Sequence, residues 1–105
     1  MIFGLEKSVI SAIQETFIKF PEVEKVIIYG SRAKGNYKKG SDIDLVLVGS
    51  GLNLTFSNKI ENALDDLLLP YTFDISIYHH ISNAELIDHI ARVGRVFYEK
   101  QKSLF

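Results

Sequence analysis

Two aspartates stand two residues apart in the segment SDIDLVLV, and their spacing restricts the chemistry available to them. Because side chains alternate along a β-strand, Asp42 and Asp44 are expected on one face, with Cα atoms about 6.6 Å apart. Two carboxylates at this spacing repel each other unless a cation lies between them. That cation could be a basic side chain or a hard metal ion. Oxygen ligands without a nearby His or Cys favour Mg²⁺ or Mn²⁺.

A glycine–serine pair precedes the aspartates and could bind an anion. Gly30 and Ser31 follow the apolar run VIIY and begin a basic segment. Glycine lets a backbone approach closely, and serine at a strand-to-helix turn offers a hydroxyl and N–H groups to a phosphate. Arg32 and Lys34 add positive charge beside this turn. Carboxylates next to a phosphate site indicate nucleotide phosphoryl or nucleotidyl transfer, although an ordinary solvated loop explains the basic segment equally well.

A third acid, Asp74, lies in the apolar segment YTFDISIY. Burying a carboxylate there is unfavourable unless it is paired or bound to a metal. If this segment is a strand beside the one that contains Asp44, Asp74 reaches the same face. It would then be a metal ligand and a candidate base for an attacking hydroxyl. Taken alone, it could also be an edge-strand charge that points to water.

A few helices and strands must position these residues. Hydrophobic periodicity, β-branched runs and proline or glycine stops predict helices over 5–20, 57–69 and 82–94, a helical turn at 31–34, and strands over 23–29, 43–48, 71–78 and 96–98. The continuously apolar 43–48 segment is typical of a strand covered on both faces. The order predicts an α/β (α+β) fold, a small mixed sheet of three to four strands with helices packed on it.

The last predicted helix carries several residues of interest. Ser82 and Glu85 form a capping-box pattern, and Gly94 lies where a C-terminal cap is expected. Its apolar stripe is expected to be core; the stripe comprises Leu86, Ile87, Ile90 and Val93. His89 is expected on the helix surface. His79 and His80 lack partners at metal-ligand spacing, so they are interpreted as loop or partner-contact residues.

Composition limits the class of protein. The chain has 105 residues, is 47% hydrophobic, has a formal net charge of −1 and contains no cysteine. We expect one domain over 1–99 with a frayed tail at 100–105, no thiolate metal site and no membrane span, and hence a cytoplasmic protein. A broad basic face is lacking, so nucleic acid is not expected as a direct substrate.

The pattern of Gly30-Ser31, ten residues, Asp42-Ile43-Asp44 and a later Asp74 resembles the signature of the DNA polymerase β-like nucleotidyltransferase superfamily. The segment YGSRAKG…KGSDIDLVLV is similar to the corresponding segment of the minimal nucleotidyltransferases of this superfamily, the MNT group. The resemblance covers residues 26–78 and implies the palm fold of that superfamily. It implies that Gly30 and Ser31 bind the β- and γ-phosphates of a nucleoside triphosphate. It also implies that Asp42 and Asp44 hold two Mg²⁺ ions, and that Asp74 shares one and helps to deprotonate the acceptor.

The resemblance also suggests a partner. MNT proteins similar to this chain are commonly paired with a helical HEPN protein, and some act as antitoxins that transfer AMP from ATP to a tyrosine of the HEPN ribonuclease. A protein adenylyltransferase is therefore expected. Two alternatives stay open: a catalytically silent binding module that neutralises its partner by contact, and a nucleotidyltransferase for a small hydroxylated acceptor whose pocket is completed by another subunit, a homo-oligomer included. Neither the acceptor nor the base preference can be read from the sequence.

Overall fold

A four-stranded mixed sheet forms the centre of the computed structural model, which describes residues 1–101. The strand order is β3-β2-β1-β4. The elements in chain order are α1 (Lys7–Ile18), β1 (Lys25–Tyr29), α2 (Gly30–Lys34), β2 (Ile43–Val48), α3 (Leu54–Asp65), β3 (Phe73–Ile77), the 3-10 turn η1 (Tyr78–His80), α4 (Ala84–Val93) and β4 (Arg95–Glu99). The predicted fold class is confirmed.

The strand pairings decide which residues meet across the sheet. Strand β1 pairs antiparallel with both β2 and β4, whereas β2 and β3 are parallel and joined by a crossover through α3. The short β4 strand lies at the edge, as predicted. In the β2–β3 register Asp44 lies opposite Asp74, and in the β1–β2 register Tyr29 lies opposite Asp44.

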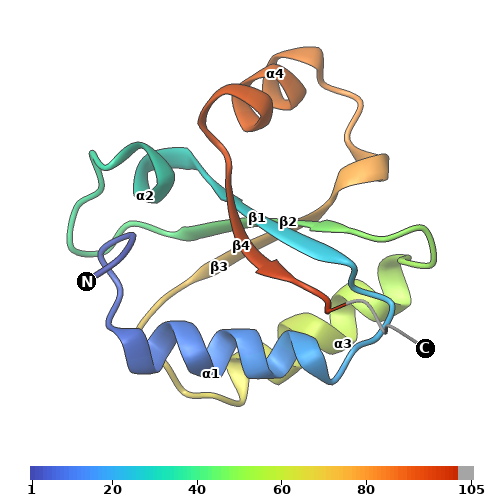
Figure 1. Cartoon of the computed structure of the whole chain (residues 1–105), viewed down its shortest axis with the longest axis horizontal. Coiled ribbons are helices and arrows are strands. Elements are labelled where there is room, and N and C mark those ends of the chain that lie inside the picture. Colours follow the sequence, from blue (N-terminus) through green and yellow to red (C-terminus); the bar gives the residue numbers. More distant parts are fainter. Residues whose placement is uncertain (102–105) are drawn as a thin grey trace.

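Alternation along the strands divides the apolar side chains between two faces. One face packs on α1 and α3 through a core that includes Ile13, Phe17, Leu45, Leu47 and Ile60, all of them fully buried. Figure 1 shows these two helices on one side of the sheet and α4 on the other.

A second, smaller core lies under α4. Tyr29, Val46 and Ile90 are buried there, with Leu86 and Val93 of the predicted apolar stripe packed against them. Strand β2 is consequently covered on both faces, as its continuous apolar run predicted.

Capping residues move the ends of two helices away from their predicted positions. Helix α3 begins three residues before the predicted 57–69 segment, because the Asn53 side chain accepts a hydrogen bond from Phe56 N at 3.0 Å. It ends at Asp65 rather than at residue 69, and Leu68 adopts a positive φ of 55° just beyond the end. The predicted boundaries of this helix are wrong at both ends.

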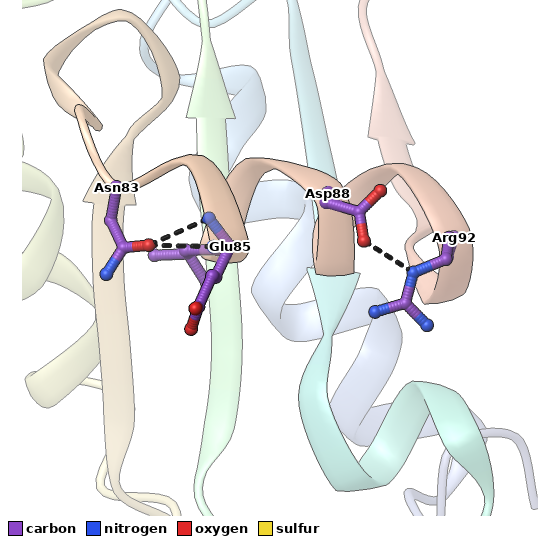
Figure 2. A network of polar contacts seen from close by, with 5 residues as sticks. Asn83, Glu85, Asp88 and Arg92 are labelled. Carbon is purple, nitrogen blue, oxygen red and sulfur yellow. Dashed lines mark hydrogen bonds and ion pairs between the residues drawn. The ribbon is translucent and has the colours of Figure 1, made fainter.

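Helix α4 is capped by Asn83 rather than by Ser82. Asn83 Oδ1 accepts hydrogen bonds from the backbone N–H groups of Glu85 and Leu86, at 2.9 and 3.2 Å (Figure 2). Gly94 is the C-terminal cap, as predicted. An exposed Asp88–Arg92 ion pair at 2.7 Å spans one turn of the helix (Figure 2) and contributes little to stability.

The segment after β4 begins with an ordered residue. Lys100, the first residue of the predicted tail, donates its backbone N–H to Glu24 O at 2.9 Å. The rest of the predicted tail, residues 102–105, lies outside the described residues. Within residues 1–101, every helix is too short or too polar to cross a bilayer.

Candidate active site

Three aspartates lie at one end of the α4 face of the sheet. Asp44 and Asp74 are directly opposite each other on the parallel strands β2 and β3, so their side chains share a face. Asp42 directly precedes β2, two residues before Asp44, and its charge acts on the Asp44 carboxyl. Asp42 and Asp74 are exposed and Asp44 is half-buried. The sheet thus places the three acids that the sequence singled out near one another at one end of the sheet.

The electrostatics of Asp44 reflect its neighbours. Burial raises the pKa of the Asp44 carboxyl above its usual value, and the negative charges of Asp74 and Asp42 raise it further. His89 and Arg32 act in the opposite direction. The three carboxylates therefore interact, with Asp44 at the centre of the repulsion.

Tyr29 lies within the same electrostatic environment. Burial raises the pKa of its phenol, a hydrogen bond with Ser76 opposes this effect, and the charges of Asp74 and Asp44 add to the increase. The phenol is therefore kept protonated and can serve as a hydrogen-bond donor beside the acids. This residue, which ends β1, was not singled out from the sequence.

The acidic residues suit a divalent cation by type and charge. All three supply oxygen ligands, and the negative charges of Asp74 and Asp42, which act on Asp44 in addition to its burial, are charges that a cation would neutralise. Among residues 1–101, however, no three His, Cys, Asp or Glu side chains lie close enough together to hold a metal ion as they are oriented here.

Gly30 is required where β1 turns into α2. It has a φ of +74°, and a Cβ atom built on it would collide with the Asp44 carboxylate. Glycine therefore lets the acidic group and the turn lie against each other. Ser31 is half-buried in this turn and Lys34 is exposed at the end of α2. The turn and the acids thus share one end of the sheet.

Arg32 has a position that differs from the one expected for a phosphate ligand. It is only 3% exposed. Its Nε and Nη2 donate to Ser41 O at 3.1 and 2.9 Å, and Nη1 donates to Phe3 O at 2.9 Å. The guanidinium also lies over the Tyr37 and Tyr71 rings, at 5.4 and 5.2 Å from their centroids. All three nitrogens are engaged, so Arg32 links the N-terminal turn to the segment that leads into β2.

His89 is the residue that the sequence interpretation misplaced. It is half-buried rather than a plain surface residue, and its Nε2 accepts a hydrogen bond from Gly30 N at 3.3 Å. Its ring meets Tyr29 edge-on, with centroids 6.1 Å apart. A signal existed, because His89 follows Leu86 by three residues and precedes Val93 by four, which puts it on the apolar side of α4. His79 and His80 are exposed in η1 and stack edge-on against each other, at 4.7 Å.

Comparisons with known proteins agree with this geometry. The family model "Polymerase beta, Nucleotidyltransferase" matches residues 11–103. A search of the curated proteins found no match.

Solved structures share the fold at low identity. The chain resembles a toxin–antitoxin complex solved with AMP-PNP, with a TM-score of 0.71, 17% identity, and 88% of this chain and 74% of that chain covered. It resembles a protein assigned as a minimal nucleotidyltransferase, with a TM-score of 0.69, 22% identity, and coverage of 90% and 95%. It also resembles a Shewanella oneidensis complex of tri-AMPylated HEPN toxin with MNT antitoxin, with a TM-score of 0.59, 14% identity, and coverage of 87% and 73%. Because the family model spans most of its length, this chain belongs to the polymerase β nucleotidyltransferase family.

Proposed function

We propose that this chain is a Mg²⁺-dependent adenylyltransferase that moves AMP from ATP to a hydroxyl of a HEPN-type partner and so acts as an antitoxin. The observation that supports this most is the register of β2 and β3, which sets Asp44 opposite Asp74 beside the Gly30 turn. A constellation of acids next to a phosphate-binding turn is suited to nucleotidyl transfer.

The turn at the end of β1 is proposed to hold the triphosphate. Ser31 would contribute its hydroxyl and backbone N–H, and Gly30 its backbone N–H, to the β- and γ-phosphates. Lys34 is exposed at the end of α2 and is free to reach a phosphate oxygen through solvent. The buried Arg32 would instead support the segment before Asp42, which is the role its contacts favour.

The three acids are proposed to act on the α-phosphate and the acceptor. Asp42 and Asp44 would hold two Mg²⁺ ions, with Mn²⁺ as a substitute, and Asp74 would share one. When bound, such ions neutralise the triphosphate and help to deprotonate an attacking hydroxyl.

The proposed transfer is an in-line displacement at the α-phosphorus of ATP. The acceptor oxygen forms a bond to the α-phosphorus while the bond from that phosphorus to the β-bridging oxygen breaks, and pyrophosphate leaves. Asp74, exposed at the edge of the acidic cluster, would receive the proton of the acceptor hydroxyl.

The proposed acceptor follows from the structural relatives. Two of them are toxin–antitoxin complexes, and one contains a HEPN toxin that carries AMP groups. Strand β3, which carries Asp74, is the outermost strand at its side of the sheet. A hydroxyl presented by a second protein could therefore approach the acids from that side.

Intact mass spectrometry tests this function. The chain is mixed with a HEPN-type helical protein, Mg²⁺ and ATP, and the masses of both proteins are measured. We expect the partner to gain one or more AMP units with wild type, and none with Asp74→Asn. As a matched control, Asp66→Asn changes an exposed acid at the end of α3 and should transfer AMP like wild type.

The same experiment separates the rival functions. A stable complex with unchanged masses would identify a contact-only binding module. Consumption of ATP in the presence of a small hydroxylated compound, with no mass gain on the partner, would indicate a small acceptor. Transfer by the Asp74→Asn variant at the wild-type rate would refute the proposed base.

A further inference from the structure

The Gly30 amide is already engaged by a side chain from α4. Its N–H donates to His89 Nε2 at 3.3 Å. In this contact Nε2 acts as the acceptor of the Gly30 N–H. The edge-on contact with Tyr29, at 6.1 Å between centroids, holds the ring in this orientation.

A phosphate oxygen and this imidazole nitrogen would compete for the same donor. Both are acceptors, and one N–H cannot bond well to both when their lone pairs point at the same hydrogen. The N–Nε2 distance of 3.3 Å is slightly longer than the roughly 2.7–3.2 Å typical of N–H···O hydrogen bonds. A phosphate oxygen that takes the Gly30 N–H as its donor would therefore displace His89 Nε2.

We propose that His89 is a positioning residue that holds the Gly30 turn while the site is empty and is displaced by the triphosphate, so that nucleotide binding is coupled to helix α4. The inference rests on the proposed function, because it assumes that the Gly30 amide binds a phosphate. Helix α4 packs on the face of the sheet that carries the acids, and its Ile90 belongs to the same buried cluster as Tyr29. Displacing His89 therefore changes the contacts of the helix that covers this face.

Two variants of His89 distinguish the effect of its hydrogen-bond acceptor from the effect of its aromatic ring. His89→Phe keeps an aromatic ring against Tyr29 and removes the acceptor, whereas His89→Gln keeps an acceptor oxygen at a similar reach. With Mg²⁺ and a nontransferable ATP analogue in calorimetry, we expect His89→Phe to bind about two- to tenfold tighter than wild type, the equivalent of one modest hydrogen bond. We expect His89→Gln to bind the analogue with an affinity close to that of wild type. The control is His79→Phe, which replaces an exposed histidine.

A spectroscopic signature distinguishes displacement from a merely structural role. The chain has three histidines, so the imidazole nitrogens can be resolved by ¹⁵N NMR. Adding the Mg²⁺–analogue complex should shift the His89 nitrogens and the Gly30 amide, and leave those of His79 and His80 in place.

The outcomes are separable. Binding by wild type with unchanged His89 resonances, or equal or weaker binding by His89→Phe, would overturn the coupling and leave the proposed function standing. No nucleotide binding by wild type or any variant, with or without the partner, would overturn both.

Discussion

Replacing Arg32 by Met should destabilise the fold more than replacing Lys34, the other charged residue of α2. The change leaves the carbonyls of Ser41 and Phe3 without their donors and removes two cation–π contacts. Losing the donor of a part-buried carbonyl costs about 1–3 kcal/mol, and a cation–π contact contributes about 0.5–1 kcal/mol. Methionine restores some apolar packing, so we expect a loss of about 3 kcal/mol. In a domain of this size that loss lowers Tm by about 12–20 °C.

Urea unfolding followed by circular dichroism measures this loss. Arg92→Met is the matched control, because Arg92 is 64% exposed and its ion pair with Asp88 should contribute less than about 0.5 kcal/mol. Arg32→Lys should fall between the two, since an ammonium group cannot serve both carbonyls from one position. If Arg32→Met unfolds at the same urea concentration as Arg92→Met, the contacts of the guanidinium do not support the segment before Asp42 as we infer.

Two further predictions concern the Gly30 turn and Asp44. Gly30→Ala should lower stability by about 1–3 kcal/mol and abolish nucleotide binding in calorimetry, because a Cβ meets the Asp44 carboxylate. Gly35 has a φ of +89° but open space around it, so Gly35→Ala should lose stability only through backbone strain and should still bind the nucleotide. In EDTA, Asp44→Asn should be more stable than wild type at pH 7, and urea midpoints between pH 4 and 7 should show the difference growing with pH. With Mg²⁺ and ATP, the same variant should lack transfer activity. The sign follows because a pKa raised in the folded state makes the ionised form of Asp44 unfavourable, so stability falls as pH rises through that pKa; a constant difference would contradict it.

Much of the fold could be predicted because its signals are local. The 43–48 strand was predicted at its observed bounds, since its apolar residues are continuous and glycines follow it. The ends of α3 and α4 were harder to predict from the sequence. Asn53 and Asn83 were not recognised as caps, and a cap depends on which side chain bends back to the backbone, a local choice that hydrophobic periodicity does not report.

The candidate site divides in the same way. The spacing of Asp42 and Asp44 was enough to predict a shared face, whereas the place of Asp74 depended on β3 pairing with β2, a contact between distant segments. The position of Arg32 could not be predicted, because Phe3 lies 29 residues away and its carbonyl is an unremarkable backbone group in the sequence. The metal-binding and catalytic roles of the acids remain predictions.

The parallel β2–β3 register has a consequence for the fidelity of folding. The pairing that sets Asp44 against Asp74 also sets Leu45 against Ile75 and Ile43 against Phe73 on the opposite, core-forming side. A slip of one residue would expose those apolar side chains and, at the same time, separate the acids. A chain with slipped strands would thus be less stable and would also lose the alignment of the acids. Packing of the hydrophobic core therefore selects the register that sets Asp44 opposite Asp74, without any dedicated contact between the carboxylates.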